Sequence, residues 1–400
     1  MHLLNRSNQN QISKRMKPDS PNGPHGLIQV FPGDPRILGF VERTGKMFAE
    51  LPWDVLGVIC KRLDFDDLFQ FSRVCTNWRD FYKSIDKSNF LTSQEPLLLE
   101  ALNCPHKGPC SFISLPKQKV YPLKNMMMNM MSYSKFPFPI YITYSSSYFI
   151  IIADNSSFLL INPFTREKKK VMYPSTFKFS YSLYKYNALL AFDKYSDEFV
   201  LVILCKKSNI LLVYQSRNNG WVTYPTTGIS NPVVDFAVLN NIIYVVTKKG
   251  KIGVLSLNFA NIKFLNLENT PNIHNISHLN LVNCEEELLL VNLTPKLRSK
   301  EVYKIDFLTM SYVKLETLGD NALFYVGWKS CKALSNPNRW GYESNTVYEV
   351  CFLFPNCNAY NWDKKSDEKN IAPPSPKIRS SIYDWCFRHI KYEVDYSLVE

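Results

Sequence analysis

Short apolar runs recur from residue 91 to the end of the chain, with Asn, Asp, Ser, Gly and Lys between them. Runs of this length, rich in Val, Ile and Tyr, are typical of β-strands. Those that define the pattern cover residues 148–153, 157–162, 198–204, 209–214, 232–239, 241–247, 251–258, 287–293 and 301–307. No amphipathic helix alternates with them, so the pattern favours antiparallel sheets over a parallel α/β fold.

Tight hairpins are indicated where Asn240-Asn241 and Lys248-Lys249-Gly250 separate two such runs, because Asn and Gly adopt the turn geometry that hairpins need. The number of strands is too large for one sandwich. Radial repetition removes the exposed sheet edges, so we expect a β-propeller over residues 91–400, with about six or seven blades at ~40–50 residues each. The segments 158–174 and 252–267 look like two versions of one hairpin, although the repeat is weak.

Residues 47–90 have helical spacing instead and form a predicted domain of three short helices. Pro52 and Asp54 suit a first turn, since the Pro needs no N–H there and the carboxylate complements the helix dipole. Asp66 is a candidate N-cap for the second helix. The apolar positions of the three helices are Val55, Leu56, Ile59 and Leu63, then Leu68, Phe71, Val74 and Cys75, then Trp78, Phe81 and Tyr82. So small a unit cannot bury all of them.

Residues 1–46 are polar, contain repeated Pro and Gly, and show no periodicity. This composition predicts a flexible or irregular N-terminal segment. The expected organisation is therefore mainly β with a small helical head: residues 1–46, 47–90 and 91–400.

The formal net charge of +12 raises the possibility of nucleic-acid binding. However, the charge is spread along the chain, and the densest basic runs, Arg166–Lys170 and Thr247–Lys251, fall where turns between strands are expected. Lysines at such places protect strand edges, so we expect no nucleic-acid partner. The ten scattered cysteines, the lack of an apolar leader and the lack of a membrane-length run predict a reduced, soluble protein of the cytoplasm or nucleus.

Motifs that carry catalytic or metal chemistry are missing from the sequence: it contains no Gly-x-Ser-x-Gly, Cys-x-x-Cys or His-Glu-x-x-His. Cys104, His106 and Cys110 have no common zinc spacing. His274 and His278 lie among predicted strands, where their spacing loses its meaning. The run Met126–Met131 indicates a loop or the edge of an early blade. We therefore predict no catalytic residue, metal or cofactor.

The segment Leu51–Arg79 resembles an F-box. The matching residues are Leu51-Pro52, Asp54, Ile59, Leu63, Asp67-Leu68 and Val74-Cys75-Thr76-Asn77-Trp78-Arg79, with Gly57 as one departure in mid-helix. The resemblance implies binding to a Skp-type adaptor, and through it to a cullin. On this reading the docking face contains Leu51, Pro52, Val55, Ile59, Leu63 and Leu68, while Val74, Cys75 and Trp78 pack the third helix and share in the contact.

The remainder resembles the plant F-box family with a KIB-type β-propeller. The resemblance rests on the Asn-Pro-x-Thr segment at residues 162–165 and on Leu318-Gly319-Asp320, Ala322–Val326, Gly341 and Asn345-Thr346-Val347-Tyr348. Acidic residues that often follow in the family are replaced by residues 349–354, "EVCFLF", so no role for them is transferred.

Together the two resemblances imply a plant substrate receptor of an SCF-type (Skp–cullin–F-box) ubiquitin ligase, without catalysis of its own, whose propeller binds a target protein. It would act by proximity, since it holds target lysines near the conjugating enzyme. Two alternatives are a propeller enzyme or small-molecule binder capped by the helices, and a basic nuclear binding protein.

Overall fold

The fold is taken from a computed structural model, which describes residues 50–396 with gaps. The residues left out are 1–49, 61–62, 64–66, 68–70, 72–73, 85–94, 103–109, 124–139, 155, 164–166, 175–185, 207–209, 226–231, 273–278, 295–298, 328, 352–355, 364–367, 375–380, 388–389 and 397–400. The chain divides into two compact units, Met1–Pro52 and Trp53–Glu400. Apart from residues 50–52, every described residue belongs to the second unit. The expected N-terminal segment 1–46, the run Met126–Met131 and the rejected candidates Cys104, His106, His274 and His278 lie outside the described residues.

In the described part of the chain two helices precede the sheets: α2 (Trp53–Cys60) and α4 (Thr76–Ser84). They confirm the first and third predicted helices, and Asp54 lies in the first turn of α2 as expected. Leu63 does not belong to α2, contrary to its predicted place. Its amide instead donates to the Cys60 carbonyl (3.2 Å), a turn that satisfies one of the carbonyls left open at a helix end. Asp67 and Phe71 are helical, but the middle helix as a whole stays a prediction.

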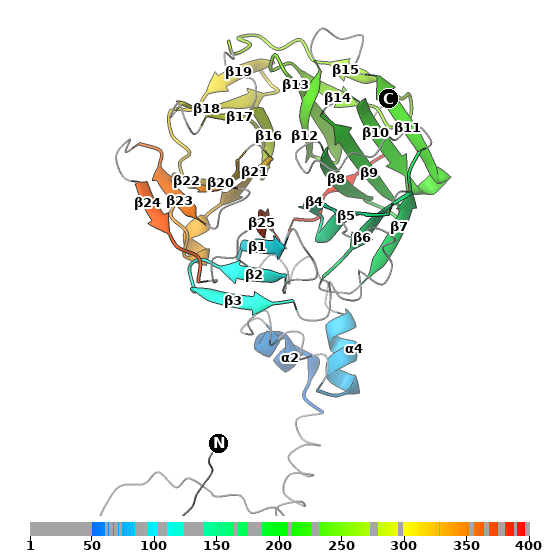
Figure 1. The fold of residues 1–400 in the computed structure, drawn as a ribbon, viewed down its shortest axis with the longest axis vertical. Helices are drawn as coiled ribbons and strands as arrows, with labels where there is room; N and C mark the ends of the chain where they lie inside the picture. The colour runs from blue at the N-terminus through cyan, green and yellow to red at the C-terminus, as the bar shows by residue number, and fades with distance from the viewer. Residues whose placement is uncertain are drawn as a thin grey trace, which may run out of the picture. The chain divides into compact units, whose positions relative to one another are not determined.

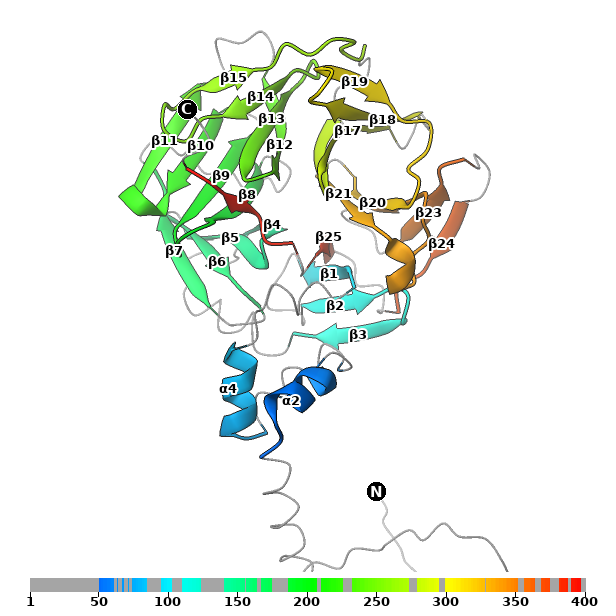
Figure 2. The same ribbon diagram turned by 180° about the vertical axis from the view of Figure 1, so that it is seen from behind.

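The described strands form six sheets of four or five strands, arranged around a common centre as the blades of a propeller (Figures 1 and 2). Blade 1 contains β25 (Ser381–Cys386), β1 (Leu97–Leu102), β2 (Ser111–Ser114) and β3 (Lys119–Pro122). Blade 2 contains β4 (Ile140–Ser145), β5 (Tyr148–Asp154), β6 (Ser157–Ile161) and β7 (Lys168–Met172). Blade 3 contains β8 (Tyr186–Asp193), β9 (Phe199–Cys205), β10 (Ile210–Gln215), β11 (Gly220–Pro225) and the added β26 (Glu393–Val394).

The remaining three sheets complete the ring. Blade 4 contains β12 (Val233–Leu239), β13 (Ile242–Thr247), β14 (Ile252–Leu255) and β15 (Ile262–Phe264). Blade 5 contains β16 (Leu279–Cys284), β17 (Glu287–Thr294), β18 (Ser299–Asp306) and β19 (Ser311–Lys314). Blade 6 contains β21 (Ser330–Ser335), β20 (Asn321–Val326), β22 (Thr346–Val350), β23 (Cys357–Asn361) and β24 (Glu368–Ile371).

The hydrophobic pattern predicted nine strands of blades 2 to 5, which are β5, β6, β9, β10, β12, β13, β14, β17 and β18, and missed the other strands of these blades. The apolar runs at 157–162 and 209–214, for example, become β6 and β10. Asn240 and Asn241 form the turn of the β12–β13 hairpin with positive φ angles of 48° and 64°, as its turn type requires. The expectation that Arg166–Lys170 lies in a turn is wrong for Lys168–Lys170, which lie in β7. That strand is the outermost of its blade, and its exposed lysines still discourage edge pairing.

The ring is closed by two strands from opposite ends of the propeller sequence. β25 pairs antiparallel with β1 over six residue pairs, from Leu97↔Cys386 to Leu102↔Ser381. This strand carries Tyr383 and Trp385, both completely buried. Trp385 and Phe387 pack edge-on against Phe324 of blade 6, with ring centroids 4.8 and 5.2 Å apart. Blade 1 is therefore assembled from the two ends of the propeller sequence, and its core is continuous with that of blade 6.

After closure the chain continues as a C-terminal tail, residues 387–396. It reaches β8, the inner strand of blade 3, where β26 pairs with it in parallel (Figure 1). The Phe192 amide donates to the Tyr392 carbonyl (2.9 Å), and the Lys194 amide to the Val394 carbonyl (3.0 Å). The Tyr392 amide donates to Ser146 Oγ of blade 2 (2.9 Å). The tail thus ties blades 1, 2 and 3 together at the centre of the ring.

Removing residues 381–400 should abolish cooperative folding of the propeller. Loss of a buried aromatic side chain costs ~3–5 kcal/mol, and two together approach the ~5–15 kcal/mol that stabilises a whole domain. Thermal unfolding followed by circular dichroism should therefore show no cooperative transition. A chain ending at residue 396 is the control and should melt like the full chain. A cooperative transition in the shorter chain would contradict the closure described here.

Candidate functional site

The helices expose an unusual number of large apolar side chains for their size. Trp53, Val55 and Val58 of α2 are 49%, 39% and 58% exposed, and Val74 just before α4 is 55% exposed. A unit this small cannot bury all of its apolar residues, and four large ones lie at its surface rather than in its core. An exposed apolar surface of this kind is typical of a site that a partner protein covers.

The interior of the helical segment is formed by other residues. Leu56, Cys60, Phe71 and Phe81 are all nearly inaccessible to solvent. Phe71 packs against Trp78 with ring centroids 4.4 Å apart, and Phe81 meets the Trp53 ring edge-on at 5.7 Å. The Trp53 indole also donates to Asn77 Oδ1 (3.0 Å), which fixes α2 against α4. Trp53 therefore helps to hold the helices together, whereas the exposed Val55, Val58 and Val74 are not part of this buried interior.

Gly57, the departure from the expected motif, is not a site of close helix approach. A methyl group added there would lie 3.8 Å from the Phe81 ring, an ordinary contact distance. The glycine is tolerated in mid-helix rather than required.

The predicted docking residues lie in the structure as follows. Pro52, Val55 and Val74 are exposed; Leu51, Ile59, Leu63, Cys75 and Trp78 are half-buried; Leu68 lies outside the described residues. Sequence reasoning missed Trp53 and Val58. The second of these could have been found, because Val55 and Val58 are three residues apart and share one face of a helix.

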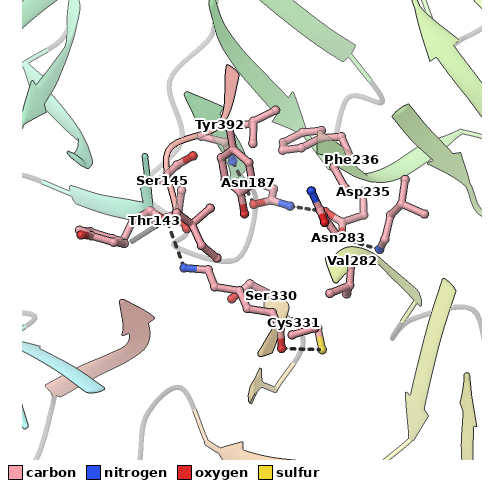
Figure 3. Close-up of a pocket in the computed structure, with 18 residues that line it drawn as sticks. Thr143, Ser145, Asn187, Asp235, Phe236, Val282, Asn283, Ser330, Cys331 and Tyr392 are labelled. Carbon is pink, nitrogen blue, oxygen red and sulfur yellow. Dashed lines mark hydrogen bonds between the residues drawn. The ribbon is translucent and has the colours of Figure 1, made fainter. Parts of the chain in front are cut away.

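The centre of the propeller forms the second candidate site, a narrow channel of about 60 Å³ lined by the inner strands of blades 2 to 6 and by Ile390 and Tyr392 of the tail (Figure 3). On one side lies Asp235 of β12. Asn187 of β8 donates to its Oδ1 (2.6 Å) and the Leu281 amide of β16 to its Oδ2 (3.0 Å). Burial raises the pKa of Asp235 to about 6, against the opposing effect of Lys206 and these hydrogen bonds. This one carboxylate joins the inner strands of blades 3, 4 and 5.

On the other side of the ring lies Asp384 of the closing strand β25. Its carboxylate accepts hydrogen bonds from Tyr141 (2.8 Å), Ser330 (3.3 Å) and the Lys329 ammonium (3.1 Å). Burial alone would raise the pKa of Asp384, but the positive charges of Lys329 and Lys332 outweigh it and hold that pKa below its ordinary value. Burial also lowers the pKa of Lys329. The cluster links blades 1, 2 and 6 at the point of closure.

These two clusters have the character of structural supports rather than of a reaction centre. The buried carboxylates are satisfied by fixed partners, as buried charges must be. Burial raises the pKa of the Cys331 and Cys110 thiols, so both are poor nucleophiles. No group of three metal-ligating side chains occurs among the described residues. Cys104, His106, His274 and His278 lie outside them.

The motif at residues 318–348 organises blade 6, in which β22 runs parallel to β20 rather than following the usual antiparallel order. Asn345, at a positive φ of 54°, accepts hydrogen bonds on its Oδ1 from Thr317 (3.0 Å) and the Leu318 amide (2.9 Å). Its own amide donates to the Asn321 carbonyl (2.8 Å). Gly341 has a φ of 82°, and an added Cβ would clash with Pro116 at 2.9 Å. The motif therefore fixes an irregular crossover.

Comparison with known families agrees with both parts of the chain. The model of the F-box domain matches residues 48–86, and the model described as the KIB1-4 beta-propeller matches residues 112–382. The chain belongs to the KIB1-4 β-propeller family. It carries an F-box domain ahead of the propeller, as the sequence motifs predicted.

Individual proteins add little to this assignment. No curated protein matches the chain. Among solved structures it is similar to TolB from Acinetobacter baumannii, with 8% identity, a TM-score of 0.38, and coverage of 72% of this chain and 66% of that one. It is also similar to apo AztD from Citrobacter koseri, with 12% identity, a TM-score of 0.32, and coverage of 50% of each chain. The chain thus spans two thirds or less of these structures, and neither likeness bears on its function. None of the described helices has the length and apolar character to span a membrane.

Asp235 should give the KIB1-4-type propeller a stability that decreases with rising pH. Because its folded pKa of about 6 lies above the ordinary value of 3.8 for this carboxyl group, the folded state holds a proton that the unfolded state releases. This stabilisation is complete below pH 3.8 and is lost as the pH rises through about 6. The difference between the two pKa values corresponds to about 3 kcal/mol.

The variant Asp235→Asn cannot titrate there, so its free energy of unfolding relative to wild type should rise over this pH range. Urea unfolding at several pH values measures the difference. Asp197→Asn, in an exposed turn of blade 3, removes the same charge and serves as the control. An unchanged difference between Asp235→Asn and wild type across the range would refute the assignment.

Proposed function

We propose that this chain is the substrate-recognition subunit of an SCF-type ubiquitin ligase. In this proposal the F-box domain, residues 47–90 with three helices, binds a Skp-type adaptor, and the propeller, residues 91–400, binds the target protein. An F-box domain joined to a β-propeller fits such a receptor. The observation that carries the proposal is the exposed apolar surface on the segment that matches the F-box model.

The adaptor contact would be built from two kinds of residues. Val55, Val58 and Val74 offer exposed apolar area that becomes favourable once a partner removes it from water. The half-buried Leu51, Ile59, Leu63, Cys75 and Trp78, together with Pro52 and Leu68, complete the proposed docking surface. Binding would also stabilise the helices, since a partner that binds only the folded form shifts the folding equilibrium towards it.

The proposed role requires no chemistry from this chain. A receptor accelerates ubiquitin transfer by raising the effective concentration of target lysines near the charged conjugating enzyme. The alternative of a propeller enzyme or small-molecule binder gains no support from the channel, because about 60 Å³ is far below the ~300–1,000 Å³ of typical ligand pockets. The proposed sites of action are the cytoplasm and nucleus of a plant cell, where the adaptor and cullin would be the partners.

Replacing Val58 or Val74 by Asp should disrupt adaptor binding. A charge placed in the centre of an apolar interface should cost at least about 2 kcal/mol, or about thirtyfold in Kd. The full chain would be co-expressed with a plant Skp-type adaptor, and capture would be compared for wild type, the two variants and a Leu51→Ala/Pro52→Ala double variant.

The matched control is Leu308→Asp, because Leu308 is a propeller residue whose side chain is 97% exposed. It should capture the adaptor as well as wild type does. If a wild-type chain with a cooperative unfolding transition captures no adaptor, the proposed function is wrong.

A further inference from the structure

At one end of the channel the propeller has a second and much larger cavity. We define the mouth end as the end where the first two strands of blades 2 to 5 are joined, by turns at residues 146–147, 194–198, 240–241 and 285–286. A cavity of about 440 Å³ opens there between the C-terminal tail and blades 4, 5 and 6. This volume lies within the range of sites that hold ligands or peptide segments.

Polar side chains on the walls of this cavity carry hydrogen-bonding groups that have no partner among the described residues. The side-chain amides of Asn240 and Asn241 form no hydrogen bond with any described residue, and Asn283 uses only its Nδ2, which donates to the Val238 carbonyl (2.5 Å). An Asn side chain offers one acceptor and a donor group, the same pair that a peptide unit offers. Side chains of this type suit an occupant that exposes its backbone.

Two charged side chains that line the same cavity place a second requirement on its occupant. Arg339 and Glu285 both line it, and neither is in an ion pair with another described residue. Arg339 is exposed and stacks on the Trp340 ring at 4.8 Å, which holds its guanidinium in place. Lys391 and Glu393 of the tail, by contrast, neutralise each other at 3.3 Å. A complementary occupant therefore carries an acidic group for Arg339 and a basic group for Glu285.

The structure already contains one extended chain at this mouth. The tail pairs with β8 through its backbone, and its Asp395 amide donates to the Asn241 carbonyl (3.1 Å). The tail contacts blades 2, 3 and 4 here, and its residues 390–393 form one wall of the cavity, whose other walls belong to blades 4 to 6. Around the same end, the turns of neighbouring blades expose Tyr195, Phe259 and Leu308, which are anchors suited to a protein surface.

We infer that the mouth cavity binds an extended peptide segment of the target protein, beside the tail. In this arrangement its backbone meets the asparagine amides while an acidic side chain pairs with Arg339 and a basic one with Glu285. The inference rests on the proposed function, because it assigns the target-binding part of the receptor to one end of the propeller.

The test is selection from a phage-displayed library of random linear peptides on the immobilised full chain. Enriched peptides should contain an acidic and a basic residue, and fluorescence polarisation should show binding weakened about tenfold or more by Arg339→Glu. Replacing the acidic residue of the peptide by Lys should restore binding to that variant. Lys248→Glu is the control, since Lys248 lies in the β13–β14 turn at the opposite end of blade 4 and is exposed.

The outcomes separate the inference from the proposed function. The same preparations are tested for adaptor capture, which involves the helices alone, and all variants must melt like wild type. Absence of any enriched peptide, or peptides that bind wild type and Arg339→Glu equally well, overturns the inference even when the adaptor is captured. Peptide binding by a chain that captures no adaptor would leave the cavity as a peptide site and reject the ligase role.

Discussion

The pairing of β25 with β1 is the constraint on which the rest of the propeller depends. Six residue pairs join strands that are nearly the whole propeller sequence apart. Forming them is costly in chain entropy, because a very long loop must be closed before the contacts between distant residues can stabilise the fold. The cost is offset where the two strands meet, since Tyr383 and Trp385 are buried there and Asp384 joins the inner strands of three blades.

The tail extends this closure and shapes the site beside it. The strand β25 closes the ring in blade 1. The tail then pairs with β8 of blade 3 and bonds to Ser146 of blade 2, so contacts with these two blades also hold the ring together. It also forms one wall of the mouth cavity, so the segment that stabilises the fold also limits what can enter the channel. Under the proposal, fold stability and peptide recognition would both depend on the tail, residues 387–396.

The sequence predicted nine strands and two helices of the described structure because their signals are local. Apolar runs such as 209–214 correspond to single strands, and Asn240-Asn241 specifies its own hairpin. Two misses are non-local. Nothing in the residues around Glu393 indicates pairing with β8, and the parallel pairing of β22 with β20 depends on a crossover that Asn345 and Gly341 hold together. One miss is local: helical spacing predicts Leu63 in the first helix, whereas it lies outside α2 and its amide donates to the Cys60 carbonyl.

The candidate sites likewise contain some residues that local patterns predict and others that only contacts between distant residues bring together. The F-box motif and the helical spacing located the exposed Val55 and Val74. Spacing from Val55 could also have indicated Val58, whereas Trp53 became visible only when exposure was known. The buried pairs Asp235–Asn187 and Asp384–Lys329 join residues 48 and 55 positions apart, and no local pattern connects them.

The central claim is that two separate surfaces serve two partners: the F-box helices an adaptor, and the propeller a target. Amide hydrogen exchange on the full chain, with and without a plant Skp-type adaptor, tests it most directly. The account predicts strong additional protection in residues 53–60 and 76–84, and unchanged exchange in the mouth turns at 240–241 and 285–286. Protection of the mouth turns by the adaptor, or no change in the helices despite binding, would contradict it.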